Sequence, residues 1–394
     1  MIFLTDADII LPDRVLTGGT IVIDGDRIID VVDGAPSTSS ADVRVELARH
    51  TIVPGFIDVH VHGVEGTDTL EGADAIARIA TRLPRYGVTA FCPTSIACSP
   101  LDLRTMLGGV RAARLNPAAG AARVLPAHLE SNFINPEYRG AQPLECLRAP
   151  CDGAEPRDGD YSGADIMREI EAARPDVGIL TIAPELDGAI DLIRRLLAHG
   201  HHVSLGHSGA TYDQAVTAID AGARQATHLF NRMTPLNHRA PGLAAAVLDH
   251  EEVVAEIICD GVHVHPSMVR VALAAKTAAK VMAITDGTAG SGLARGSRAG
   301  LGGRNITVRD AAYLDDGTLA GSVLTMDRAF AMLVHGMRLS PVDAATVCAT
   351  SPARALGLQG FGVIAPGATA DLAVLGPEFT VRQSWIGGEL VFGS

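Results

Sequence analysis

The chain has 394 residues, of which 47% are hydrophobic, 20% are charged and only 4% are aromatic. This length allows one large domain together with a smaller one, and the composition excludes a disordered chain, a collagen and a small disulfide-stapled protein. With 32 basic against 45 acidic residues, the formal net charge is −13. This charge argues against nucleic acid or a polybasic membrane contact and favours a small molecule as the partner.

The cysteines and the N-terminal residues indicate the compartment in which the protein is expected to lie. The six cysteines form no C-x-x-C pair and lie mostly in apolar runs, so we expect buried, reduced thiols and no structural zinc; they are Cys92, Cys98, Cys146, Cys151, Cys259 and Cys348. The first residues lack a basic stretch followed by a small-residue cleavage site, and no uncharged run approaches the ~20 residues of a membrane span. We therefore expect a cytoplasmic protein without a membrane partner.

Both ends of the chain are predicted to form short β-strands. Residues 1–53 contain apolar runs broken by turn signals, with Asp24-Gly25 as a hairpin turn. Residues 370–375 and 385–392 repeat this style. Because isolated hairpins are marginally stable in water, we expect the two ends to pair in one small β-sandwich domain, made of residues 1–53 and 357–394.

The segment between the two ends, residues 54–356, alternates short apolar strands with alanine-rich helical stretches such as 72–86 and 190–199. Eight strands are expected at 53–62, 88–94, 124–130, 178–185, 202–207, 225–231, 253–263 and 281–286. Eight strands with helical crossovers in about 300 residues predict an α/β fold of the (β/α)8 barrel type, whose reactive groups lie at the carboxyl ends of the strands. The alternative is a doubly wound open sheet, which requires a glycine-rich phosphate turn after the first strand. That strand is followed by His60-Val-His-Gly instead, and residues 287–303 are expected to form a loop.

Potential metal ligands follow several of the predicted strands. His60 and His62 alternate on the first strand, so both imidazoles can face one ion. Other candidates stand at or near later strand ends, namely Glu130, His207, His228 and Asp286. Four histidines and two carboxylates at one end of a barrel predict one or two divalent-metal sites.

The lysine content restricts how two metals would be bridged. Some binuclear barrel hydrolases use a carboxylated lysine, but Lys276 and Lys280 are the only lysines of this chain. Both fall in the helical stretch after the seventh predicted strand, away from the strand ends. We therefore expect Glu130 to be the bridging or shared ligand.

Several motifs together carry a resemblance to a known family. They are Pro54-Gly-Phe-Ile-Asp-Val-His-Val-His-Gly, His128-Leu-Glu, Gly206-His-Ser, His228-Leu-Phe-Asn-Arg-Met-Thr-Pro-Leu-Asn-His-Arg-Ala-Pro-Gly, Asp260-Gly-Val-His, Thr285-Asp-Gly and Leu319-Ala-Gly-Ser. The chain resembles the N-acetylglucosamine-6-phosphate deacetylases of the amidohydrolase superfamily over nearly its whole length. The stretch 228–242 is the most specific part, because a generic metal-dependent barrel has no reason to carry it.

The resemblance implies roles for individual residues. It implies that Glu130, His207 and His228 bind the main metal, that His60 and His62 belong to a second site, and that Asp286 is the catalytic acid/base. Substrate contacts are implied for Ala141, Gln142, Asn231, Arg239, His263, Leu319, Ala320 and Gly321, to which we add Arg232 and Asp260 from the same motifs. Arg239 is expected to engage a phosphate, a task that suits a forked, permanently charged guanidinium. The metal is expected to be zinc, with iron, manganese or cobalt as alternatives, and the family members are usually homodimers.

The chain departs from the family pattern at four places. Ser131-Asn132 stands where Gly-Pro is usual, Gln142 replaces a histidine, Arg232 replaces an alanine and Gly287 stands where alanine is common. These departures concern substrate recognition and leave the metal ligands and Asp286 in place.

The function expected from these residues is removal of acetate from N-acetyl-D-glucosamine 6-phosphate, by a metal-activated water with Asp286 as the acid/base. The first alternative is a deacetylase of another N-acyl amino sugar or amide, phosphorylated or not. Further alternatives are a deaminase or cyclic-amide hydrolase, and a non-catalytic protein that binds a sugar phosphate.

Overall fold

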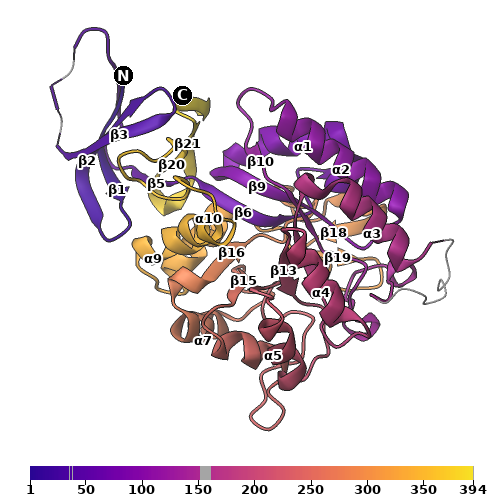
Figure 1. Cartoon of the computed structure of the whole chain (residues 1–394). Coiled ribbons are helices and arrows are strands. Elements are labelled where there is room, and N and C mark those ends of the chain that lie inside the picture. Colours follow the sequence, from indigo (N-terminus) through magenta and orange to yellow (C-terminus); the bar gives the residue numbers. More distant parts are fainter. Residues whose placement is uncertain (35, 38, 151–160, 394) are drawn as a thin grey trace.

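A nearly closed barrel of parallel strands forms the centre of the protein in the computed structural model, which describes residues 1–34, 36–37, 39–150 and 161–393 (Figure 1). Its strands are β6 (Phe56–Val61), β9 (Val88–Ser95), β10 (Arg123–Val124), β11 (Ala127–Leu129), β12 (Val177–Ile182), β13 (His202–Leu205), β14 (Gln225–Ala226), β15 (Val254–Ile258) and β16 (Val281–Ile284). The first and last strands meet through a parallel bridge between Val61 and Gly287. The predicted barrel is confirmed, with strands shorter than expected and with the third strand divided between β10 and β11.

Helices follow most of the barrel strands and pack around them. They are α1 (Ala73–Arg82), α2 (Pro100–Leu115), α3 (Gly163–Ala172), α4 (Ala189–Ala198), α5 (Tyr212–Asp220), α6 (Gly242–Asp249), α7 (Pro266–Lys276), α8 (Met326–Ala331), α9 (Pro341–Ala345) and α10 (Ser351–Ala355). Short 3-10 turns are η1 (Thr69–Glu71), η2 (Leu83–Tyr86), η3 (Pro136–Tyr138), η4 (Leu144–Cys146), η5 (Arg174–Asp176), η6 (Ala278–Lys280) and η9 (Pro377–Phe379), and π-helical turns are η7 (Met332–Gly336) and η8 (Thr346–Thr350). Helix α1 illustrates the packing, because it buries Ile76 and Ile79 on one face at helical spacing.

Strands from both ends of the chain form one smaller sheet beside the barrel (Figure 1). They are β1 (Ile2–Ile10), β2 (Val15–Asp24), β3 (Arg27–Asp33), β4 (Val43–Glu46), β5 (Thr51–Pro54), β20 (Leu372–Leu375), β21 (Val381–Ile386) and β22 (Glu389–Phe392). The ends are joined where β5 pairs antiparallel with β20, and their apolar side chains share a core that includes Ile52 and Trp385. The pairing of the two chain ends is confirmed, and their strands form one eight-stranded sheet where a small β-sandwich domain was expected. The division of the chain at residues 53/54 and 356/357 stays a prediction.

Two further groups of strands lie outside the barrel and the small sheet. A hairpin of β7 (Gly63–Val64) and β8 (Thr67–Asp68) follows the first barrel strand, and β17 (Arg298–Leu301), β18 (Arg304–Val308) and β19 (Ala312–Leu314) form a three-stranded antiparallel sheet after the last one. Strand β17 corrects the expectation of a continuous loop over 287–303. Gly302 and Gly303 supply the reason, because both have positive φ angles and form the tight turn of a β17–β18 hairpin.

Membrane spans and disulfides were also expected to be absent. Within the described ranges, no helix has both the length and the apolarity needed to cross a membrane. The five cysteines in the described ranges are free thiols, four of them buried and Cys146 partly buried. Cys151 lies outside the described residues.

Gly63 places the first histidine pair against the end of the last barrel strand. The backbone N–H groups of His62 and Gly63 both donate to the carbonyl oxygen of Gly287, at 2.8 and 2.9 Å. A Cβ atom at Gly63 would clash with the carbonyl oxygen of Thr67 and lie 2.9 Å from the backbone nitrogen of Ala289. We expect Gly63→Ala to lower the free energy of unfolding by about 1–3 kcal/mol, measured by urea denaturation.

The matched control for this substitution is Gly108→Ala on α2, where a Cβ would meet no atom within 4 Å. This variant is expected to gain about 0.5–1 kcal/mol, since alanine is the better helix former. Equal stability of Gly63→Ala and wild type would contradict the close approach of the backbones at Gly63.

Candidate metal centre and active site

Side chains from the ends of three barrel strands meet at the carboxylate of Glu130. Glu130 follows β11, His207 follows β13 and His228 follows β14, and all three are buried. Glu130 Oε1 lies 2.6 Å from His207 Nε2 and 2.8 Å from His228 Nε2, and the two imidazole nitrogens are 3.1 Å apart. The predicted trio is therefore brought together at one point.

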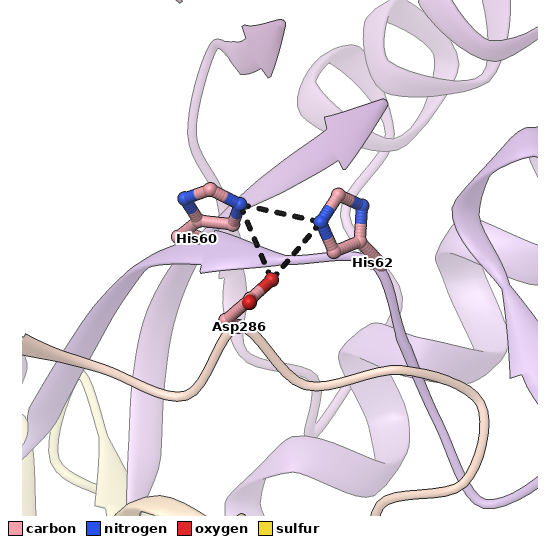
Figure 2. A group of neighbouring side chains, drawn as sticks. All are labelled: His60, His62 and Asp286. Carbon is pink, nitrogen blue, oxygen red and sulfur yellow. Dashed lines mark hydrogen bonds and ion pairs between the residues drawn. The ribbon is translucent and has the colours of Figure 1, made fainter. Parts of the chain in front are cut away.

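A second trio lies at the junction of the first and last barrel strands (Figure 2). His60 and His62 extend from β6 and its end, and Asp286 faces them from the loop after β16. His60 Nε2 and His62 Nε2 are 3.2 Å apart, and Asp286 Oδ1 lies 3.5 and 3.2 Å from them. Alternation along the strand thus points both imidazoles at the same carboxylate.

Glu130 connects the two trios. Its Oε2 lies 3.5 Å from His62 Nε2, while its Oε1 lies 4.0 Å from His60 Nε2. The lysines are remote from this point: Lys276, at the end of α7, donates to the backbone carbonyl of His250, and Lys280 ends η6. The carboxylate of Glu130 therefore lies between the two histidine pairs, and neither lysine does.

Backbone strain is concentrated in the residues that carry these groups. His207, His228 and Asp286 have φ angles of 48°, 29° and 49°, a left-handed region that non-glycine residues seldom adopt. Each such residue costs about 1–3 kcal/mol, and it persists only where neighbouring contacts fix it. For Asp286 these contacts are its N–H, which donates to the His60 carbonyl at 3.0 Å, and its own carbonyl, which accepts from the Ser322 N–H at 2.8 Å.

The outer ring nitrogens of two histidines are held by acceptors. His60 Nδ1 lies 3.0 Å from Glu256 Oε2, and His207 Nδ1 lies 2.9 Å from the carbonyl oxygen of Tyr138. An acceptor at Nδ1 keeps the proton there and leaves the Nε2 lone pair free to bind a metal. Sequence reasoning missed Glu256, whose signal was an acidic residue inside the otherwise apolar strand β15.

Burial and neighbouring charges set the ionisation of the cluster. Burial lowers the pKa of His60 to about 3, so its imidazole is neutral at pH 7. Burial raises the pKa of Glu256 to about 7, although the nearby imidazoles of His128 and His228 oppose the shift. Burial also disfavours an ionised Glu130, but the close contacts of its carboxylate with His207 and His228 outweigh it and hold the Glu130 pKa well below its usual range.

The donor set matches a divalent metal centre. Four imidazole Nε2 atoms and the carboxylates of Glu130 and Asp286 converge in a buried space. Imidazole and carboxylate ligands are those preferred by zinc, iron, manganese and cobalt. The cluster is therefore able to hold a metal ion.

A cavity of about 60 Å³ opens directly on these groups. Of the predicted substrate contacts, seven line it: Ala141, Gln142, Asn231, Arg232, His263, Leu319 and Gly321. Asp260 is outside the lining but contacts one of its residues, since its Oδ2 lies 2.6 Å from His263 Nδ1. Ala320 is instead fully buried in the core beside Ile306, and Arg239 lies on an exposed loop outside the cavity lining.

The sequence departures next to the cluster have visible structural roles. The Oγ of Ser131 donates to the Thr181 carbonyl at 2.5 Å, and the Asn132 amide donates to the carbonyls of Cys98 and Cys146 at 2.8 and 2.7 Å. Both residues are buried, so these bonds fix the loop after Glu130.

Gln142 bridges the cluster to the backbone. Its amide nitrogen donates to Glu130 Oε2, and its amide oxygen accepts from the Ala97 N–H at 2.7 Å. Gln142 therefore contacts the central carboxylate as well as lining the cavity.

Glu185 supports the loop after His207 from outside the cluster. Its carboxylate accepts from the Ser208 hydroxyl at 2.7 Å and from the Gly209 N–H at 2.6 Å. Glu185 therefore supports the loop that carries His207.

Comparisons with known proteins place this geometry in a family. The amidohydrolase family matches residues 51–391. The N-acetylglucosamine-6-phosphate deacetylase of Bacillus subtilis is 32% identical over 99% of this chain and 97% of its own length, and the N-acetylgalactosamine-6-phosphate deacetylase of Escherichia coli O157:H7 is 32% identical over 92% and 93%. A solved structure of a variant N-acetyl-D-glucosamine-6-phosphate deacetylase from Mycobacterium smegmatis, in complex with N-acetyl-D-glucosamine-6-phosphate, is 33% identical, covers 99% of both chains and has a TM-score of 0.87. The chain therefore belongs to the amidohydrolase family, within its group of N-acetylglucosamine-6-phosphate deacetylases.

Proposed function

We propose that this enzyme hydrolyses the acetamide of N-acetyl-D-glucosamine 6-phosphate, giving acetate and glucosamine 6-phosphate. The observation that carries the proposal is the carboxylate of Asp286, which lines the cavity and lies 3.2 Å from His62 Nε2 beside the histidine–glutamate cluster. An acid/base next to a metal centre in a small buried cavity is the minimum that amide hydrolysis requires.

The proposed ligands of the main metal are Glu130, His207 and His228, and those of a second metal are His60 and His62. Zinc is the first choice, with iron, manganese and cobalt as alternatives. A divalent cation bound in this way lowers the pKa of a water and polarises an amide carbonyl.

A side chain of the protein transfers the proton from the attacking water to the departing amine. Asp286 Oδ1 is placed to accept the proton of the attacking water and to deliver it to the nitrogen of the departing amine, which leaves readily only when protonated. Gln142 keeps the Glu130 carboxylate in place, and Asp260 orients His263 at the cavity wall. Asn231, His263 and Leu319 line the space available to the sugar.

The substrate is tested by measuring acetate release from N-acetylglucosamine 6-phosphate, N-acetylgalactosamine 6-phosphate and unphosphorylated N-acetylglucosamine. We expect the highest kcat/KM for the first compound. A preference for the galactosamine derivative is the second candidate, which the similarity to the Escherichia coli enzyme and the departures at Gln142 and Arg232 favour. No acetate from any of the three would contradict the proposal.

Glu256 provides a prediction about the second metal. Glu256→Leu removes the acceptor at His60 Nδ1, so we expect binding at the His60/His62 pair to weaken about 10- to 100-fold, as is usual when an outer hydrogen-bond partner of a metal ligand is lost. The measurement is metal stoichiometry by elemental analysis, together with zinc titration of metal-depleted protein.

Glu256→Gln is the matched control, because its amide oxygen still accepts from His60 Nδ1. We expect this variant to retain more of the second-site affinity than Glu256→Leu. Identical zinc titrations for wild type and Glu256→Leu would show that Glu256 does not position His60.

Two further expectations stay predictions. They are the homodimer, implied by the family resemblance, and the cytoplasmic location.

A further inference from the structure

A second cavity, of about 490 Å³, lies at the end of the barrel opposite the metal cluster. Its lining includes residues that precede or begin β11, β12 and β13, whereas the metal cluster stands where such strands end. Strand β12 has 6 residues with a rise of about 3.3 Å each, so about 20 Å separates the two ends of the barrel. This cavity is therefore distinct from the one that contains Asp286.

Four basic side chains line this cavity, and among the described residues no aspartate or glutamate does. They are Arg114, Arg174, His199 and His202. This lining is the reverse of the overall charge balance, since the chain has a formal net charge of −13. An anion is therefore the kind of ligand that the lining favours.

Three of the four basic side chains contribute little free positive charge. Arg114 donates to the carboxylate of Asp176, which balances its charge. His199 Nδ1 lies 3.9 Å from Glu171 Oε1. Burial lowers the pKa of His202, so its imidazole is mostly neutral at pH 7 and offers hydrogen bonds without a net charge.

Arg174 supplies the free charge of this cavity. It belongs to η5, immediately before β12, and it is exposed. Within the described part of the chain its guanidinium makes no hydrogen bond and no ion pair. Its base is held, because the next residue is Pro175, whose carbonyl accepts from Arg114 at 2.5 Å. A forked guanidinium that is anchored at its base and free at its head suits bidentate binding of a carboxylate.

Most of the remaining lining is apolar and includes Val124, Leu125, Pro126, Leu356 and Leu358. The two leucines, which follow α10, are only partly buried, so a ligand with an apolar body would remove part of their surface from water. The volume falls within the range of about 300–1,000 Å³ that is usual for small-molecule pockets. A simple inorganic anion would leave most of this space and its apolar wall uncovered.

We propose that this cavity is a second binding site, which takes a small organic acid with one carboxylate and an apolar body. Arg174 binds the carboxylate, and Leu125, Leu356 and Leu358 pack against the apolar body. One free permanent positive charge matches the single charge of a carboxylate, whereas a phosphate monoester carries about −1.5 to −2 at pH 7. The site lies away from the metal cluster and does not depend on the proposed function.

The test is titration calorimetry of the metal-loaded enzyme with hexanoate and with its uncharged counterpart, hexanamide. Charged hydrogen bonds are worth about 10- to 100-fold in binding, so we expect Arg174→Met to weaken hexanoate binding by about that factor and to leave hexanamide binding unchanged. Arg174→Lys retains the charge and is expected to recover part of the loss. The matched control is Arg111→Met on α2, an exposed arginine outside the lining, which keeps the wild-type affinity for hexanoate.

Two further measurements complete the test. Hexyl phosphate is titrated in the same way, and we expect weaker binding than for hexanoate. Acetate release by Arg174→Met is expected to equal that of wild type, because Arg174 lies at the other end of the barrel. Equal hexanoate affinity in wild type and Arg174→Met, or no binding of hexanoate to wild type, would overturn the site. Tighter binding of hexyl phosphate than of hexanoate would overturn the choice of a carboxylate.

Discussion

Asp286→Asn is expected to release acetate about 100- to 10,000-fold more slowly than wild type, measured with N-acetylglucosamine 6-phosphate at saturation. The amide of asparagine has nearly the shape of the carboxylate, but it can neither accept the proton of the attacking water nor donate one to the amine. The metal content of the Glu130 trio is expected to stay at its wild-type value, because Asp286 lies in the other trio.

The control for this variant is Asp310→Asn, an exposed aspartate in the turn before β19, which is expected to keep wild-type activity. If Asp286→Asn kept its metal and released acetate at the wild-type rate, Asp286 could not be the acid/base. A parallel loss of metal and activity would instead make it a ligand only.

Glu130→Gln is expected to abolish both metal binding at the main site and acetate release. Glu130 lies between His207 and His228 and faces His62 as well, so one substitution removes the carboxylate of the first trio and the contact of that carboxylate with the second. Loss of an outer partner of a ligand costs about 10- to 100-fold in metal affinity, and loss of the ligand itself is expected to cost more. Elemental analysis and zinc titration provide the measurement.

Glu185→Gln is the matched control for Glu130→Gln. Glu185 holds the loop after His207 through Ser208 and Gly209 but does not face the metal trio. We expect it to bind metal at wild-type stoichiometry, so that a ligand is distinguished from a loop support. A full complement of metal in Glu130→Gln would contradict the assignment of Glu130.

The barrel and the positions of the six cluster residues were predictable because they follow from local patterns. Apolar strands end in polar residues, and parallel strands around a barrel bring those ends to one face. His60 and His62 share a face through strand alternation alone, as Figure 2 shows.

Contacts between distant strands were not predictable from such patterns. The bond between His60 and Glu256 joins residues 196 positions apart and depends on the register of β6 and β15 around the barrel. Similarly, Arg232 lines the cavity and Arg239 does not. This difference depends on the course of the loop that carries them, which includes left-handed residues at Phe230 and Arg232, with φ angles of 77° and 49°. Strand β17 was missed because glycine and serine in 287–303 indicate a loop, while only the Gly302-Gly303 turn and pairing with β18 make it a hairpin.

The most direct test of the account is acetate release from N-acetylglucosamine 6-phosphate by metal-depleted wild type as zinc is added back. The account predicts that the depleted protein is inactive and that activity rises with bound zinc until one or two ions per chain are held. Undiminished acetate release from protein without detectable metal would contradict it.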